Sequence, residues 1–109
     1  MFFEYKILQH TYICSYNKCM ELEFDPDKRR KTLVERELDF ADANHVFEGK
    51  HFTAEDFREG YNEQRFITVG KLDDRMIVLV WTPREQTRRI ISMRKANERE
   101  QKRYDHLLD

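Results

Sequence analysis

Three consecutive apolar segments in the second half of the chain constrain the fold more than any other feature. They are "RFITVGKL" (65–72), "RMIVLVWT" (75–82) and "RRIISM" (88–93), and their branched and aromatic content is typical of β-strands. The middle segment holds the continuous apolar run "MIVLVW", which predicts a central strand covered on both faces. "DD" at 73–74 predicts a tight turn, and the polar stretch "PREQ" at 83–86 separates the last two segments. We therefore expect an antiparallel sheet.

Helices are expected before and after these strands. Asp25 followed by Pro26 is typical of a helix start, because the carboxylate accepts a hydrogen bond from the first turn and proline lacks only an N–H that has no helical partner there. This pattern predicts one helix over "DPDKRRKTLVEREL" (25–38), and the spacing of apolar residues predicts a second over "DFADANHVF" (39–47). The charged segment "KANEREQKRYDHLL" (95–108) is expected to form the last helix.

The remaining segments complete the expected architecture. "MELEF" (20–24) alternates as a short strand does, and the polar residues 50–63 are interpreted as a loop. The order β-α-α-β-β-β-α indicates an α+β domain, with two N-terminal helices packed on an antiparallel sheet of three to four strands and a C-terminal helix. Residues 20–109 form this domain. We interpret residues 1–19 as an N-terminal extension, either an upstream start or an extra edge strand.

Composition and motifs exclude several classes of function. The chain has 109 residues, a formal net charge of -1 and a pI near 6.4, so its overall charge does not favour nucleic acid. It has no glycine-rich phosphate loop, no H-E-x-x-H and no G-x-S-x-G, and its four histidines are scattered. No metal and no cofactor are therefore expected. Without an apolar run long enough for a membrane, and with only Cys14 and Cys19 as thiols, a cytoplasmic protein is expected.

The strands begin and end in cations. These are Arg65, Arg75, Arg88, Arg89, Arg94 and Lys95, with a further run "KRRK" at 28–31. Arginine offers a planar fork of donors that matches phosphate, and lysine offers a point charge. Trp81 and Tyr61 are candidates to stack a base. The sequence thus permits two interpretations: a rim that holds a phosphodiester backbone, or ordinary solubilising cations.

Four stretches together carry a resemblance to a known family. They are "EFDPDKRRKTL", "DFADANHVF", "NEQRFITVG" and "DRMIVLVWTPREQTRRIISMRKANERE". In this order and spacing the chain from about Met20 to Tyr104 resembles the BrnT toxins of type II toxin–antitoxin systems. Phe24 stands where the family phrase F-E-W-D-P-x-K has Trp, and Met93 where R-I-I-S-A-R-x-A has Ala. The family's N-x-x-K-H-G is replaced by "TLVERE" at 32–37.

The resemblance implies a fold, an activity and partners. Similar proteins have a RelE-like fold and are ribonucleases that cut RNA and inhibit translation. A cognate antitoxin with a ribbon-helix-helix part neutralises them, and operator DNA is bound only through that antitoxin. The implied partners are therefore the antitoxin and an RNA substrate, with no membrane. An inactive interaction module of the same fold, which only binds such an antitoxin, is the alternative, and the retained cations favour activity.

Metal-independent RNA cleavage lets the 2′-OH attack the phosphate, and it needs a base, an acid and cations for the developing charge. From the residue types and the motifs we expect the catalytic groups to be Lys28, Glu63, Arg65, Arg89, Ser92 and Arg94. RNA-binding residues are expected at Lys31, Tyr61, Trp81 and Lys95. Strand alternation places Ser92 on the same side as Arg94. Two alternatives stay open: Glu63 and Arg65 as a local ion pair, and Arg94 as an antitoxin contact.

Overall fold

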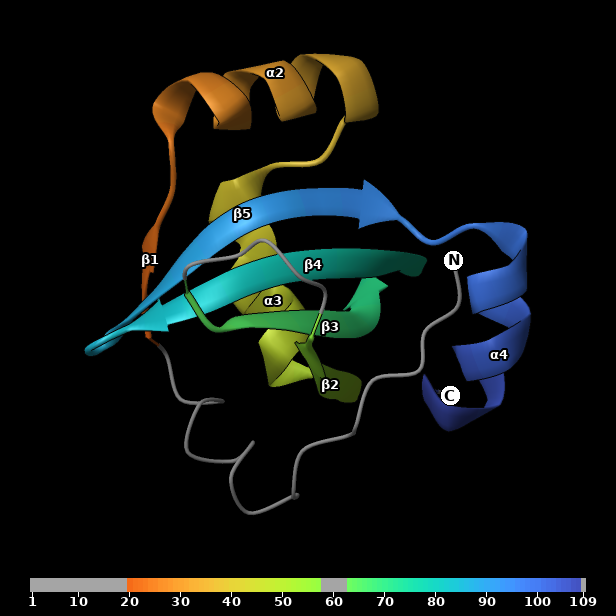
Figure 1. The fold of residues 1–109 in the computed structure, drawn as a ribbon. Coiled ribbons are helices and arrows are strands. Elements are labelled where there is room, and N and C mark those ends of the chain that lie inside the picture. Colours follow the sequence, from red (N-terminus) through yellow and green to blue (C-terminus); the bar gives the residue numbers. More distant parts are fainter. Residues whose placement is uncertain (1–19, 58–62, 109) are drawn as a thin grey trace.

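The described part of the chain, residues 20–57 and 63–108 of a computed structural model, is built around a five-stranded mixed sheet (Figure 1). The sheet order is β1-β5-β4-β3-β2. The α+β class is confirmed. The strands are β1 (Glu21–Glu23), β2 (His51–Asp56), β3 (Arg65–Leu72), β4 (Arg75–Arg84) and β5 (Thr87–Lys95), and the helices are α2 (Pro26–Arg36), the 3₁₀ turn η1 (Phe40–Asp42), α3 (Ala43–Glu48) and α4 (Glu98–Leu108).

The expected sheet of three to four antiparallel strands is wrong in two respects. The first is that β1 runs parallel to β5, with Glu21 beside Thr87 and Glu23 beside Arg89, so the sheet is mixed. The sequence indicated a short strand there but carried no local signal for its partner, because the pairing spans most of the chain. The other neighbouring strands pair antiparallel.

The second error lies in residues 50–63, which were interpreted as a loop. Residues 51–56 form β2, which pairs along its whole length with β3. The polar composition hides this strand, because one of its inward residues is a threonine rather than an apolar side chain. Thr53 is buried, and its hydroxyl lies 2.8 Å from that of Thr68 on β3. A buried hydroxyl pair across two strands thus takes the place of an apolar contact.

The turns explain where the central strands stop. Asp73 and Asp74 have φ values of 52° and 65°, which is the geometry of a two-residue hairpin turn and confirms the predicted turn. The "PREQ" stretch is not a separator, since β4 continues through Pro83 and Arg84. Proline is tolerated there because the pairing of β3 with β4 has already ended at Trp81, so β4 has an edge at Pro83 and pairs only with β5.

Two apolar clusters cover opposite faces of the sheet. On the face called the α3 face, residues such as Ile77 and Leu79 of β4 pack with Phe47 of α3. On the other, called the α4 face, Val78 of β4 packs in a cluster that includes Leu108 of α4. In Figure 1, α3 lies behind the strands and α4 lies beyond the end of β5. The prediction that the "MIVLVW" run is a central strand covered on both faces is confirmed.

The helix starts follow from local capping. Asp25 accepts a hydrogen bond of 2.9 Å from the N–H of Asp27, with Pro26 at the first helical position, as predicted. The helix ends at Arg36 rather than residue 38, because Glu37 adopts a left-handed backbone with φ 57°. The predicted second helix divides into η1 and α3.

Helix α2 has no buried residue and lies apart from the other helices, above β5 in Figure 1. A fork of two hydrogen bonds attaches it, from Arg29 Nε to Asp39 Oδ1 (2.7 Å) and from Arg29 Nη2 to Asp39 Oδ2 (3.0 Å). The same carboxylate caps η1 through the N–H of Ala41. Arg36 adds a hydrogen bond of 2.9 Å to the carbonyl of Met93 on β5.

The Arg29–Asp39 pair predicts how stability depends on pH. The hydrogen bonds from Arg29, and then that from the N–H of Ala41, hold the pKa of the Asp39 carboxyl below its usual value, despite burial. The stabilisation is therefore fully present above the unfolded-state pKa of about 3.9 and is lost as the pH falls through the lower folded-state pKa. We expect Asp39→Asn to lower the urea unfolding midpoint, followed by circular dichroism, at neutral pH and to match wild type in strong acid. Asp105→Asn is the control, at an exposed position of α4 where the carboxylate lies 3.9 Å from Lys71 Nζ. A loss of stability in Asp39→Asn that does not depend on pH would contradict this account.

Candidate active site

A row of alternating charges crosses the α4 face at the end of the sheet where β4 turns into β5. This row, here called the charged strip, consists of Arg65, Glu63, Arg84, Glu23 and Arg89. Between guanidinium nitrogen and carboxylate oxygen, Glu63 lies 3.7 Å from Arg65 and 3.3 Å from Arg84. Glu23 lies 3.9 Å from Arg84 and 3.2 Å from Arg89. Because three arginines share two carboxylates, the strip keeps a net positive charge.

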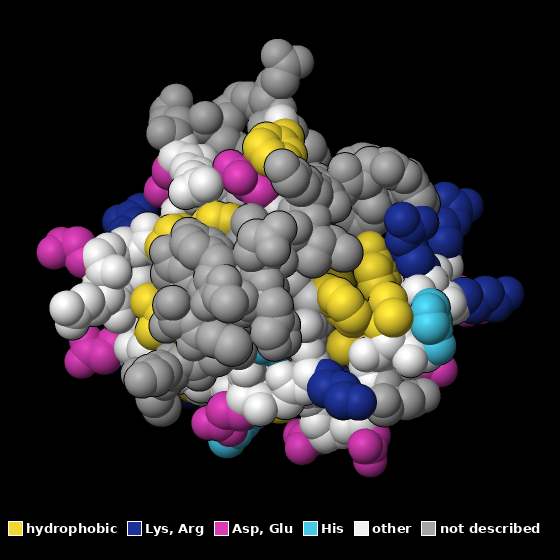
Figure 2. All heavy atoms as spheres, turned by 90° about the horizontal axis from the view of Figure 1, so that it is seen from below, with side chains coloured by type: hydrophobic (Ala, Val, Ile, Leu, Met, Phe, Trp, Pro, Cys, Tyr) yellow, Lys and Arg dark blue, Asp and Glu magenta, His cyan; other side chains and the backbone are white. Residues whose placement is uncertain are grey.

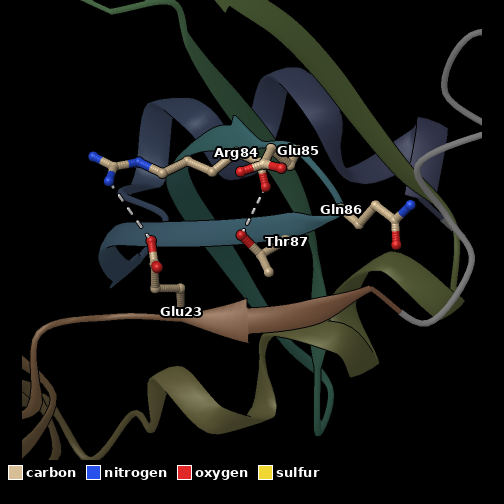
Figure 3. A pocket seen from close by; sticks show the side chains of 5 residues that line it. All are labelled: Glu23, Arg84, Glu85, Gln86 and Thr87. Atoms are coloured by element: carbon tan, nitrogen blue, oxygen red, sulfur yellow. Dashed lines mark hydrogen bonds and ion pairs between the residues drawn. The ribbon is translucent and has the colours of Figure 1, made fainter.

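Four strands position the strip. Register places Thr82 of β4 beside Arg89 of β5, and Arg89 beside Glu23 of β1. In Figure 3, Arg84 and Glu23 reach toward each other across β5, at the side of a pocket. The lining residues of that pocket are Glu23, Arg84, Glu85, Gln86 and Thr87. The charged strip therefore borders a pocket at the β4–β5 turn, and Arg84 is the arginine of the strip that lines it.

A β-bulge extends this positive face along β5. Arg89, Ser92 and Arg94 pair with Thr82, Val80 and Val78 of β4, and the register shifts between Val80 and Trp81. Thr82, Val80 and Val78 alternate along β4 and so share one face of the sheet. The three β5 residues share that face only because Ile91 is the extra residue of the bulge. In a regular strand Arg89 would point to the face opposite Ser92 and Arg94.

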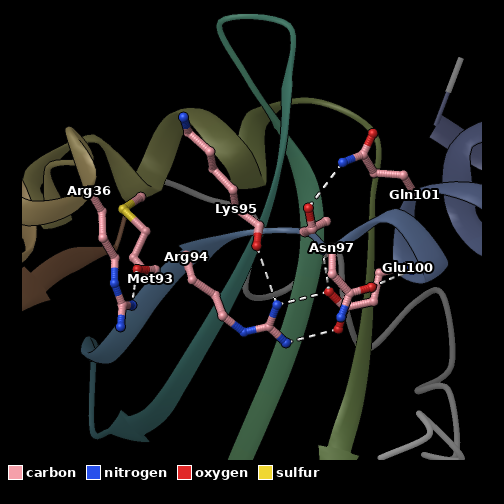
Figure 4. A network of polar contacts seen from close by, with 8 residues as sticks. Arg36, Met93, Arg94, Lys95, Asn97, Glu100 and Gln101 are labelled. Carbon is pink, nitrogen blue, oxygen red and sulfur yellow. Dashed lines mark hydrogen bonds and ion pairs between the residues drawn. The ribbon is translucent and has the colours of Figure 1, made fainter.

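Arg94 is held by Glu100 at the start of α4 (Figure 4). Its Nη1 and Nη2 donate hydrogen bonds of 2.8 Å each to Glu100 Oε1 and Oε2, and Nη1 also lies 3.3 Å from the carbonyl of Lys95. The Arg94 side chain is 43% exposed, whereas that of Glu100 is 14% exposed. Arg94 hydrogen bonding lowers the pKa of the Glu100 carboxyl, and the N–H of Asn97 adds to this against the effect of burial.

The other residues expected at the site lie elsewhere. Lys95 pairs with Ile77 of the α3-face cluster, and Figure 4 shows its side chain pointing away from Arg94. Lys28 and Lys31 are exposed on α2, and within the described ranges no hydrogen bond or ion pair joins them to the charged strip. Tyr61 lies outside the described residues.

The expectation that Trp81 stacks an RNA base is wrong. Trp81 is 1% exposed, and its indole N–H donates a hydrogen bond of 2.8 Å to the hydroxyl of Thr68. The interpretation of Arg88 as a rim cation is wrong as well. Its guanidinium carbon lies 3.5 Å from the ring centre of Phe47 and 4.9 Å from that of Trp81, and the residue has no exposed surface. Both residues belong to the core of the α3 face.

Three residues of this surface were not identified from the sequence. Glu23 and Arg84 carried no signal, because only the tertiary fold brings β1 beside β5. Glu100 did carry one: Asn97 followed three residues later by Glu100 is the spacing of a capping box. The two reciprocal hydrogen bonds are present, from Glu100 N to Asn97 Oδ1 (2.8 Å) and from Asn97 N to Glu100 Oε1 (2.9 Å).

The arrangement of the α4 face suits binding of a polyanion. Figure 2 views the molecule from below Figure 1 and so shows a different side, on which Lys and Arg side chains gather at the right edge beside hydrophobic side chains. Among residues 20–57 and 63–108, no group of three or more His, Cys, Asp or Glu side chains is placed to bind a metal ion. None of the helices in this part of the chain has the length and apolar character that a membrane span requires.

Comparison with known proteins gives the family. The search of curated proteins returned no match for the chain. A family model described as the ribonuclease toxin BrnT of type II toxin–antitoxin systems matches residues 24–100, which run from Phe24, just after β1, through β2–β5 to the first turn of α4. A toxin of this kind implies an antitoxin partner. With more than half of its length matched, the chain belongs to the BrnT family of ribonuclease toxins.

Proposed function

We propose that this toxin is an endoribonuclease that cleaves RNA on the α4 face, needs no metal ion, inhibits translation and is neutralised by a cognate antitoxin. The observation that supports the proposal best is the alignment of Arg89, Ser92 and Arg94 on one face of β5 by the bulge. Arginine forks match phosphate oxygens, and three arginines of the strip with Arg94 supply such forks along one surface.

The proposed reaction is an attack of the 2′-oxygen on the adjacent phosphorus. The P–O bond to the 5′-oxygen breaks, a base takes the 2′-OH proton and an acid supplies a proton to the leaving 5′-oxygen. Arg65, Arg89 and Arg94 stabilise the negative charge that develops on the phosphorane oxygens. Glu63 is the base, because its carboxylate is the acceptor between Arg65 and Arg84 in the strip. Ser92 lies between the cations of β5 and donates a hydrogen bond to the phosphate.

The remaining cations are assigned to RNA binding beyond the scissile phosphate. Lys28 and Lys31 are exposed on α2, which lies along β5, and a point charge suits contacts with neighbouring phosphates. We move Lys28 from the catalytic group to this role, since no contact brings it to the strip in the described part of the chain. We propose that Lys95, at the end of β5, contacts RNA that continues past this strand.

The experiment that tests this function compares matched RNA and DNA oligonucleotides of mixed sequence with the purified toxin in excess EDTA. Cleavage of RNA alone, leaving a 2′,3′-cyclic phosphate and a 5′-hydroxyl, is the expected result. Cleavage that stops with EDTA would show that a metal ion is required. Intact RNA under all conditions, together with a stable antitoxin complex, would identify the chain as a binding module without activity.

We further propose that the antitoxin carries a ribbon-helix-helix part, covers the α4 face, and links the toxin to operator DNA. An exposed row of cations needs to be shielded in a cell that contains RNA, and Phe57, 62% exposed after β2, offers an apolar anchor. We expect an interface of about 1,200–2,000 Å² or larger.

Charge reversal at two arginines tests whether the antitoxin covers the α4 face. Arg89→Glu combined with Arg94→Glu is expected to weaken the antitoxin complex by about 10- to 100-fold, because acidic groups of the partner would lose their counter-charges. Calorimetric titration with the antitoxin encoded by the neighbouring gene measures the affinity, and Lys50→Glu combined with Arg30→Glu gives the same change in net charge elsewhere. Equal affinity of both double variants would place the antitoxin on another face.

A further inference from the structure

The carboxylate of Glu100 performs two tasks at one place. Its Oε1 accepts the N–H of Asn97 and so closes the capping box of α4, and the same oxygen accepts Arg94 Nη1. Its Oε2 accepts Arg94 Nη2. A capping box alone needs no arginine, so the fork to Arg94 is an additional interaction that ties a β5 side chain to the first turn of α4.

The backbone between the two residues is fixed as well. The N–H of Ala96 donates a hydrogen bond of 2.8 Å to the carbonyl of Met76, at the start of β4. The carbonyl of Ala96 accepts one of 3.0 Å from Gln101 Nε2. Ala96 is also buried. The sheet and the helix therefore both hold Ala96, in the middle of the connection, and the Glu100 carboxylate reaches Arg94 from a fixed backbone.

The exposed fractions of the Arg94 and Glu100 side chains show that Glu100 is the residue that holds the other in place. Glu100 is largely covered, whereas much of Arg94 remains accessible on the same face as Ser92 and Arg89. An exposed arginine without such a partner samples many rotamers, and a donor that must be ordered during the reaction stabilises a transition state less well than one already in place. The pair is thus built as a fixed carboxylate that carries an accessible cation.

We propose that Glu100 is a positioning residue of the ribonuclease site, which holds the Arg94 guanidinium in place for the developing phosphorane charge. The inference rests on the proposed catalytic role of Arg94. It adds a separate role for Glu100, which acts through Arg94 and does not itself touch the substrate. It has a consequence for kinetics: the carboxylate also offsets part of the charge of Arg94. Its removal should weaken catalysis without weakening the ground-state attraction to RNA.

The chain offers a variant that separates the two tasks of Glu100. Glutamine is accepted at this position of a capping box, so Glu100→Gln keeps the start of α4 but breaks the two-oxygen fork. With a fluorogenic RNA oligonucleotide of mixed sequence, we expect kcat to fall about 10- to 100-fold while KM stays equal or decreases. Asn97→Ala removes the other half of the capping box and leaves the fork, so it should lower thermal stability with little change in kcat. Glu98→Gln, in the same helical turn, is the control for lost charge.

Two further measurements make the test decisive. Glu100→Asp keeps a charge at the helix start but shortens the reach, and we expect a kcat between those of wild type and Glu100→Gln. Nuclear magnetic resonance of the Arg94 guanidinium should show slow rotation in wild type and fast rotation in Glu100→Gln. The inference would be overturned if Arg94→Ala loses cleavage as expected but Glu100→Gln keeps the wild-type kcat. A fall in kcat of Glu100→Gln no larger than that of Asn97→Ala would overturn it in the same way. If Arg94→Ala is itself active, the proposed role of Arg94 fails first, and the two failures are thereby distinguished.

Discussion

Replacing Arg94 with alanine is expected to lower RNA cleavage on the order of 100-fold and to abolish growth arrest, while the protein stays folded. Removing one preorganised donor to a developing oxyanion typically costs about 10²- to 10³-fold in kcat. The fold should survive, because Arg94 is 43% exposed and the capping box of α4 remains complete without it. Single-turnover cleavage of an RNA oligonucleotide and growth after induced expression measure the two effects.

A matched arginine makes this result specific. Arg99→Ala removes an exposed cation from α4, outside the strip, and is expected to leave cleavage within about 2-fold of wild type. Circular dichroism should show the same fold for both variants. Growth arrest by Arg94→Ala at equal soluble expression would show that this arginine is not part of the active site.

The neighbouring residues Arg88 and Arg89 are expected to respond to alanine in opposite ways. Arg88→Ala should lower the free energy of unfolding by about 3–5 kcal/mol, since it empties a fully buried site and removes the contacts with Phe47 and Trp81. It also removes the donor to Asn44, which holds the carbonyl of Met20 beside β1. For a small domain, such a loss is a large part of the total stability.

Arg89→Ala is the matched control for stability. Arg89 of β5 is partly exposed and forms an ion pair with Glu23 of the neighbouring strand β1. An ion pair of this kind contributes about 1 kcal/mol or less to stability. Urea unfolding of both variants, followed by circular dichroism, gives the comparison. Under the proposed function Arg89→Ala loses cleavage instead of stability. Similar unfolding midpoints for the two variants would contradict the assignment of Arg88 to the core.

Much of the fold could be predicted where the signal is local. The continuous run from Met76 to Trp81, the Asp73–Asp74 turn and the start of α2 at Asp25 each depend on neighbouring residues, and each is confirmed. β2 and the partner of β1 could not be found in this way. The first is held by pairing with β3 and a buried threonine pair, and the second by a contact between the two ends of the domain.

The candidate site shows the same division. Residue type indicated Arg89 and Arg94, but composition cannot separate Arg88 from Arg89, because the two differ only in which face of β5 they occupy. Strand alternation alone would place Arg89 and Arg94 on opposite faces of the sheet. They lie on the same face, since Ile91 of β5, between them, has no partner on β4. Glu100 was within reach of sequence reasoning, since a capping box is a local pattern.

The bulge at Ile91 decides whether the two β5 arginines, Arg89 and Arg94, lie on the same face of the sheet or on opposite faces. Arg89 and Arg94 are an odd number of residues apart, which would place them on opposite faces of a regular strand. They share one face because Ile91, between them, has no partner on β4. A substitution inside the interval between the two arginines changes one side chain and leaves this pairing intact. A deletion of Ile91 would leave four regular steps between the two arginines, so the ladder of hydrogen bonds would close as a regular strand and both arginines would still lie on one face. The active surface thus depends on how many residues of this interval pair with β4, more than on the interval's length or composition.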